Sequence, residues 1–150
     1  MAIAMMSGHS AAIWLRVCII VHAAESEVLM LTAEIRSELA EAGLDCTEMI
    51  EKFMDSEAMF LKYFKKFFDA ADSVVEELSA AIEADDAGTI ENRAHALKGL
   101  SGNIGLNGVF IPARKIVDDV RAGKYDEYKT DLTQLKAAYA KARSVSVKID

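Results

Sequence analysis

The sequence predicts an all-α protein: an antiparallel up-and-down four-helix bundle with additional short helices on its N-terminal side. From Asp45 onward, apolar residues recur in alternating steps of four and three, the spacing of helices that pack at a shallow angle. The connections between these segments are short, which makes sequential helices antiparallel neighbours. The 150 residues include one proline, and no alternating pattern typical of a β-strand competes with the helical one.

The first two predicted elements are a short helix and a long one. Asp45 followed by Glu48 resembles a capping box and predicts a short helix that ends at about Phe53. Asp55 or Ser56 can cap the next helix. We interpret the apolar residues of this long helix as core packing, not as a cofactor site: Phe60, Phe64, Phe67, Ala71, Val74, Leu78 and Ala81.

Three further helices complete the predicted bundle. Residues 85–88 break the pattern and start the second long helix, which we expect to end near Gly105 as the chain turns through residues 107 and 108. Gly123 ends the third. The inner face of the third helix is predicted to consist of Val109, Ala113, Ile116 and Val120. That of the fourth is predicted to consist of Tyr128, Leu132, Leu135, Tyr139 and Ala142.

The predicted domain boundaries are an N-terminal extension over residues 1–30, the bundle over residues 31–146 and a tail over residues 147–150. The apolar run from residue 11 to residue 24 is too short to span a membrane, and Arg16 interrupts it. Three interpretations of the extension remain open: an additional helix, a signal-like segment, or sequence upstream of a true start at Met30.

The amino-acid composition restricts the kinds of partner that this chain can bind. The net charge of −7 argues against nucleic acid, because no basic stripe is available to replace counterions along a phosphate backbone. Cys18 and Cys46 lack the spacing of a metal or redox motif, which fits a reducing cytoplasm. We therefore expect a cytoplasmic monomer that binds neither membrane nor nucleic acid and holds no metal.

Residues 94–106, AHALKGLSGNIGL, contain the candidate functional residues. At about 100° per residue, the helix separates two faces. The outward face carries Glu91, His95, Lys98, Gly99 and Gly102. The inward face carries Ile90, Ala94, Leu97, Ser101 and Ile104. A glycine inside a helix costs about 0.8–1 kcal/mol relative to alanine. The two glycines remove side chains around the imidazole, which indicates a docking surface.

The residue types on the outward face favour phosphoryl chemistry. A histidine with an unperturbed pKa of about 6.5 is largely neutral near neutral pH, and its ring nitrogen can then accept a phosphoryl group. Lys98, one turn along the same face, can neutralise part of the added charge. No catalytic base, metal cluster or phosphate-binding loop accompanies them. We therefore expect a substrate site for another protein's chemistry, not an enzyme.

This segment resembles the signature of histidine phosphotransfer (HPt) domains, HxxKG followed by a second glycine ten residues after the histidine. The matching residues are His95, Lys98, Gly99 and Gly105. The resemblance covers roughly Leu31 to Arg143. It departs from the family at Leu100, where a small residue is usual, and at Pro112, where we expect the third helix to begin or bend.

The resemblance implies a phosphorelay intermediate. His95 would accept a phosphoryl group from the aspartate of a response-regulator receiver domain and pass it to another receiver. Lys98 would stabilise the phosphoryl charge, and Gly99 and Gly102 would permit close approach. Leu97 would hold the helix to the core, and Gly105 would shape its end. No intrinsic cofactor is implied, since the receiver would supply Mg²⁺; a hybrid histidine kinase is a further implied partner.

Two more residues are candidates for partner binding. If the chain reverses near Leu106, Arg121 comes within about one turn of the level of His95 and can approach a phosphoryl group or an acidic partner. Asn92, one turn before His95, either orients the imidazole by a hydrogen bond or is a solvated polar residue.

Two alternatives stay open. The chain could be a helical adaptor that binds receivers without accepting phosphate, or the detached phosphoacceptor domain of a chemotaxis-type kinase. We expect no phosphorylation from ATP, because 150 residues leave no room for a kinase domain beside the bundle and the chain has no phosphate-binding loop.

Overall fold

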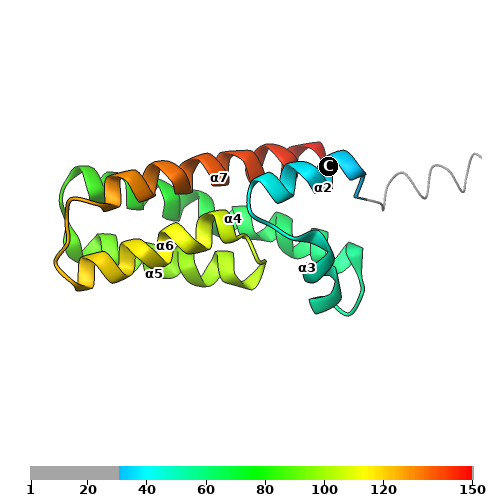
Figure 1. Ribbon diagram of the computed structural model, residues 1–150, viewed down its shortest axis with the longest axis horizontal. Helices are drawn as coiled ribbons and strands as arrows, with labels where there is room; N and C mark the ends of the chain where they lie inside the picture. The colour runs from blue at the N-terminus through cyan, green and yellow to red at the C-terminus, as the bar shows by residue number, and fades with distance from the viewer. Residues whose placement is uncertain (1–30, 150) are drawn as a thin grey trace, which may run out of the picture. The chain divides into compact units, whose positions relative to one another are not determined.

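The computed structural model describes residues 31–149, which form helices joined by turns and short loops (Figure 1). The helices are α2 (Ala33–Glu41), α3 (Cys46–Lys52), α4 (Glu57–Glu83), α5 (Ala87–Asn103), α6 (Asn107–Arg121) and α7 (Tyr128–Lys148). Residues 31–149 contain no β-strand, so the all-α prediction is confirmed. The predictions for residues 1–30, including the signal-like segment and the start at Met30, lie outside the described residues.

The predicted caps explain where α3 and α4 begin. The Asp45 carboxylate accepts hydrogen bonds from the backbone N–H groups of Thr47 and Glu48, at 2.9 and 3.1 Å, and α3 follows. Ser56, one of the two candidates, caps α4 by accepting from the Met59 N–H at 3.2 Å. These side chains satisfy donors that have no partner inside the helix, which sets both starting points.

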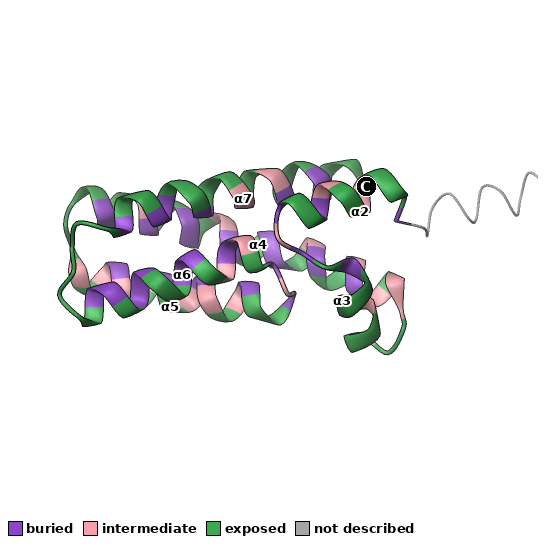
Figure 2. Ribbon diagram, in the orientation of Figure 1, coloured by how far each residue is buried: buried purple, intermediate pink, exposed green. Residues whose placement is uncertain are grey.

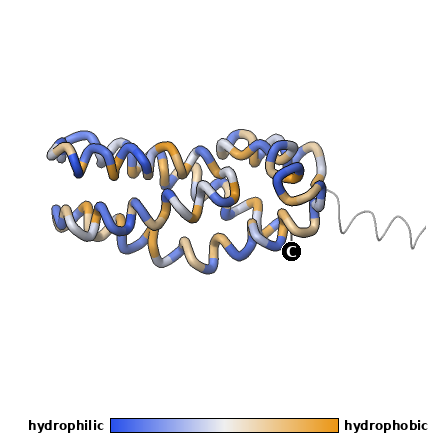
Figure 3. Tube along the Cα trace, turned by 90° about the horizontal axis from the view of Figure 1, so that it is seen from below, coloured by the Kyte–Doolittle hydropathy of each residue, from blue (hydrophilic) through white to orange (hydrophobic). Residues whose placement is uncertain are grey.

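The apolar faces predicted from the sequence form the core. All seven residues predicted for the inner face of α4 are buried, and so are those predicted for α6 and α7 (Figure 2). In the trace coloured by hydropathy, hydrophobic and hydrophilic residues alternate along the helices (Figure 3). Aromatic rings interlock between α4 and α7, where Phe68 and Tyr139 meet edge to face with ring centroids 5.5 Å apart.

The four long helices pack in a cycle. Helix α4 contacts α5, α5 contacts α6, α6 contacts α7, and α7 returns to α4 (Figure 1). The short helix α2 lies against α7, and α3 bridges α2 and α4. This order places the histidine helix α5 between α4 and α6, with its remaining face open.

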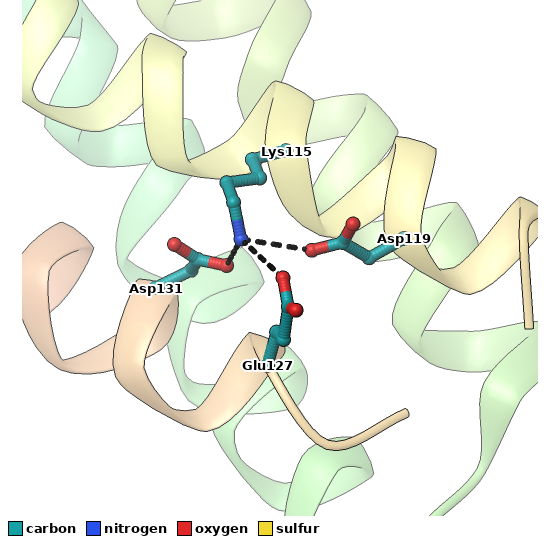
Figure 4. A network of polar contacts seen from close by, with 4 residues as sticks. All are labelled: Lys115, Asp119, Glu127 and Asp131. Carbon is teal, nitrogen blue, oxygen red and sulfur yellow. Dashed lines mark hydrogen bonds and ion pairs between the residues drawn. The ribbon is translucent and has the colours of Figure 1, made fainter. Parts of the chain in front are cut away.

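A polar network joins α6 to the start of α7. The Lys115 ammonium donates to Asp119 at 3.0 Å, to Glu127 at 3.3 Å and to Asp131 at 2.8 Å (Figure 4). Asp119 and Asp131 are buried, and buried carboxylates are costly unless they are paired. Lys115 thus makes their burial between the two helices possible.

The start of α6 corrects two predictions. The chain turns at residues 104–106, not at 107 and 108, and Asn107 is the first residue of α6. Of the two alternatives at Pro112, a helix that begins there is wrong, because Pro112 lies buried inside α6. The reason is a tertiary contact: the Gly43 carbonyl accepts the Asn107 N–H at 3.0 Å and caps the helix five residues before the proline.

The end of α7 lies beyond the predicted bundle boundary at residue 146. The helix continues to Lys148, whose ammonium donates to the Glu38 carboxylate of α2 at 2.7 Å. Lys141 and Glu41 form a second ion pair between the same two helices. The last turn of α7 is therefore held by α2.

Candidate functional site

The helix that carries His95 is capped by Asp86. The Asp86 carboxylate accepts the backbone N–H of Thr89 at 3.2 Å and the Thr89 hydroxyl at 2.6 Å. These hydrogen bonds, the hydroxyl's first, lower the pKa of Asp86 and keep the cap charged near the positive end of the helix dipole. These contacts set the start of α5 at Ala87.

The two faces of α5 are those that the helical wheel predicts. Ile90, Ala94 and Leu97 are fully buried, whereas His95 is exposed. Ser101 is buried without loss of hydrogen bonding, because its hydroxyl donates to the Leu97 carbonyl at 2.7 Å. The side of α5 that carries His95 therefore faces away from the core.

His95 lines a shallow pocket of about 300 Å³ between α5 and α6. Gly88, Glu91 and Asn92 line it from α5, and Arg121 lines it from α6. The structure thus brings Arg121 to the histidine, where the register of an antiparallel helix pair predicts it. Lys98, one turn beyond His95, is half-buried and does not line this pocket.

Arg121 is held in the pocket by Glu91. The Arg121 Nε donates to a Glu91 carboxylate oxygen at 2.6 Å. Asn92 is exposed, and among residues 31–149 it makes no hydrogen bond to His95. The pocket therefore offers an accessible imidazole beside one arginine that already has an anionic partner.

The two glycines on the outward face have different surroundings. A Cβ atom added at Gly99 would meet no atom within 4 Å, so this position opens to solvent. A Cβ atom at Gly102 would lie 3.3 Å from the Phe110 ring of α6, closer than most carbon contacts. Gly99 leaves space for an approaching molecule, whereas Gly102 also allows α5 and α6 to pack closely.

Gly105 lies in the turn after α5 and has a backbone φ of +67°, a conformation that glycine adopts without strain. A Cβ atom there would also lie 2.3 Å from the Met49 sulfur of α3. Both observations explain a glycine ten residues after His95, since the turn that brings α6 back beside α5 depends on it.

Glu91 is the residue that sequence reasoning missed. The helical wheel places Glu91 on the face of His95, one turn earlier, but no partner is predicted for it from the sequence. One signal could have found it: Arg121, which carries the opposite charge, is predicted to lie near the level of His95 on the neighbouring helix.

Among the described residues, no group of three His, Cys, Asp or Glu side chains could hold a metal ion.

Comparison with known proteins identifies the family. The Hpt domain family model matches residues 62–145, more than half of the chain, and the chain belongs to this family. No curated protein and no solved structure matches it. None of the helices in the described part is long and apolar enough to cross a membrane.

Family membership defines the class of activity. Hpt domains are phosphocarriers that take part in histidine phosphotransfer within phosphorelays, and they interact with receiver domains and kinases. The match covers α5, α6 and nearly all of α4 and α7, and it includes the whole pocket around His95.

Proposed function

We propose that His95 accepts a phosphoryl group from a receiver-domain aspartate and passes it to a second receiver. One observation carries this proposal. The chain has three histidines, at positions 9, 22 and 95, and only His95 falls within the residues that match the Hpt family. It is also exposed, on a helix face where Gly99 leaves open space.

The transfer step needs only one nucleophilic atom from this chain. The lone pair of an imidazole nitrogen forms the N–P bond, while the bond between phosphorus and the receiver's carboxylate oxygen breaks. The electron pair leaves on that carboxylate, and the proton on the other ring nitrogen stays there. Reversal of these steps on a second receiver returns the phosphoryl group to an aspartate.

The neighbouring residues have supporting roles in this proposal. Phosphoryl transfer depends mainly on positioning and on stabilisation of negative charge. Lys98 would contribute a mobile positive charge one turn from His95, and Gly99 would let the receiver approach. The receiver would hold Mg²⁺, and this chain would supply no cofactor.

The fold that we propose for this activity is the antiparallel up-and-down four-helix bundle. The cycle of contacts from α4 through α5 and α6 to α7, with short connections between successive helices, supports it. That the protein is monomeric and cytoplasmic stays a prediction, which gel filtration and cell fractionation can test.

A panel of phosphorylated receivers tests the proposed function. Wild-type protein is expected to gain an acid-labile phosphoryl group from at least one receiver, and His95→Gln is expected to gain none. Receiver binding without transfer would overturn the proposal in favour of an adaptor. Transfer to His95 from a kinase domain alone, without a receiver, would instead indicate the acceptor domain of a chemotaxis-type kinase.

A further inference from the structure

Glu91 and Arg121 connect α5 to α6 at the pocket that contains His95. Their ion pair is short, with 2.6 Å between the Arg121 Nε and a Glu91 oxygen. Neither side chain is buried: the exposed fractions are 55% for Arg121 and 39% for Glu91. Glu91 precedes His95 by one helical turn, so carboxylate, imidazole and guanidinium share one pocket.

A phosphoryl group on His95 would change the balance of charge in this pocket. Phosphate on a side chain carries about −1.5 to −2 charges and three strong acceptor oxygens, and arginine binds such groups through paired N–H donors. Arg121 is the cationic residue that lines the pocket, and its Nε is already committed to Glu91. The carboxylate and the phosphoryl group would thus compete for one guanidinium.

We propose that Glu91 is a positioning residue that holds Arg121 until His95 is phosphorylated and then competes with the phosphoryl group for it. This inference rests on the proposed function, since it requires a phosphoryl group on His95. In the unmodified protein, the Glu91 carboxylate accepts the hydrogen bond of the Arg121 Nε–H group. In the phosphorylated protein, it weakens the hold of Arg121 on the phosphoryl group and so favours onward transfer.

The equilibrium of phosphoryl transfer measures this competition. A receiver that phosphorylates the wild type is mixed with each variant until the ratio of phosphohistidine to phosphoreceiver is constant. Glu91→Gln is expected to raise this ratio about three- to fivefold, the range of a partly exposed ion pair. Arg121→Gln is expected to lower it. The double variant should match Arg121→Gln alone, because Glu91 acts through Arg121.

A matched control separates this effect from a general loss of charge. Glu77→Gln removes a carboxylate that also pairs with an arginine of α5, Arg93, at 2.8 Å, but on the side of α4. Its transfer ratio should equal that of the wild type. If Glu91→Gln raises the ratio equally with and without Arg121, direct repulsion is at work and the inference is wrong.

A spectroscopic measurement tests the change of partner directly. The NMR signal of the Arg121 Nε–H group is expected to shift when His95 is phosphorylated, and Glu91→Gln should move the unphosphorylated signal as well. A signal that phosphorylation leaves unchanged would overturn the inference. A wild type that takes no phosphoryl group would overturn the proposed function too, whereas normal transfer with an unchanged Glu91→Gln ratio would overturn this inference alone.

Discussion

At the scale of single residues, exposure and neighbours distinguish side chains that share one helix face. His95 and Gly99 open to solvent, Lys98 is half-buried, and Gly102 lies against Phe110. The sequence pattern treats the two glycines alike, but only Gly99 has no internal packing partner. Substitutions on this face should therefore separate receiver docking from folding.

Replacement of Lys98 by alanine should slow phosphoryl transfer by about tenfold, because a nearby positive charge stabilises the transferring group. The fold should persist, since alanine favours a helix and Lys98 is not part of the buried core. Rapid-quench transfer from a phosphorylated receiver measures the rate, and circular dichroism checks the fold. Lys62→Ala, an exposed lysine of α4, is the control. An unchanged rate for Lys98→Ala would remove Lys98 from this role.

Gly99→Leu should weaken receiver binding without harming the fold. The open space at Gly99 accepts a side chain, and leucine in place of glycine raises helix stability by up to about 1 kcal/mol. The same side chain would clash with a docked receiver and lower its affinity by about tenfold or more. Calorimetry and urea denaturation measure the two effects. Ala137→Leu, which adds a leucine at an exposed position of α7, is the control. Normal receiver affinity in Gly99→Leu would contradict the proposed docking surface.

At the scale of helices, the network around Lys115 fastens α6 to α7. Hydrogen bonds to Asp131 and then to Asp119 raise the pKa of Lys115 above its usual value. A group whose pKa is higher in the folded state stabilises the fold fully below its unfolded pKa, about 10.4 for lysine. This stabilisation disappears only as the pH rises through the higher folded value, so it should be constant over the neutral range.

Lys115→Gln should therefore lower the free energy of unfolding by the same amount at pH 7 and pH 9, because Asp119 and Asp131 lose their charged partner. Above about pH 10.5 the difference from wild type should shrink, because the lysine of the unfolded chain loses its proton there whereas the folded ammonium keeps it, and this favours the unfolded state of the wild type. Urea denaturation at each pH measures it. Lys129→Gln, an exposed lysine of α7, should have a smaller effect. Equal effects of the two substitutions would show that the network does not stabilise the fold.

At the scale of the whole described chain, the loop between α2 and α3 docks on the start of α6 by direct backbone contact. A Cβ atom at Gly108 would lie 2.1 Å from the Ala42 carbonyl oxygen and 2.8 Å from the Ala138 Cβ. A Cβ atom at Gly43, which has a backbone φ of +86°, would in turn lie 2.4 Å from the Gly108 backbone nitrogen. The N-terminal helices, which lie outside the family match, are in this way attached to the phosphotransfer helices.

Gly108→Ala should lower the free energy of unfolding by about 2–3 kcal/mol, because the loop must move and the cap from Gly43 to Asn107 is lost. This is a loss of stability, whereas alanine in place of glycine inside a helix usually raises the free energy of unfolding. Urea denaturation measures the effect. At Gly88 a Cβ atom makes only ordinary contact, 3.8 Å from Asp86, so Gly88→Ala is the matched control. A Gly108→Ala protein as stable as this control would contradict the close approach.

The sequence by itself determined that the described chain is all-α, which face of each long helix is buried and that His95 is exposed. These properties repeat every 3.6 residues along one segment, so local spacing is enough to predict them. Only the tertiary structure decided that Arg121 meets Glu91, that Lys115 reaches Asp131, and that the Gly43 carbonyl accepts the Asn107 N–H at the start of α6. These contacts join separate segments, and they depend on how far each helix is shifted and rotated against the next, which the packing of the whole core sets.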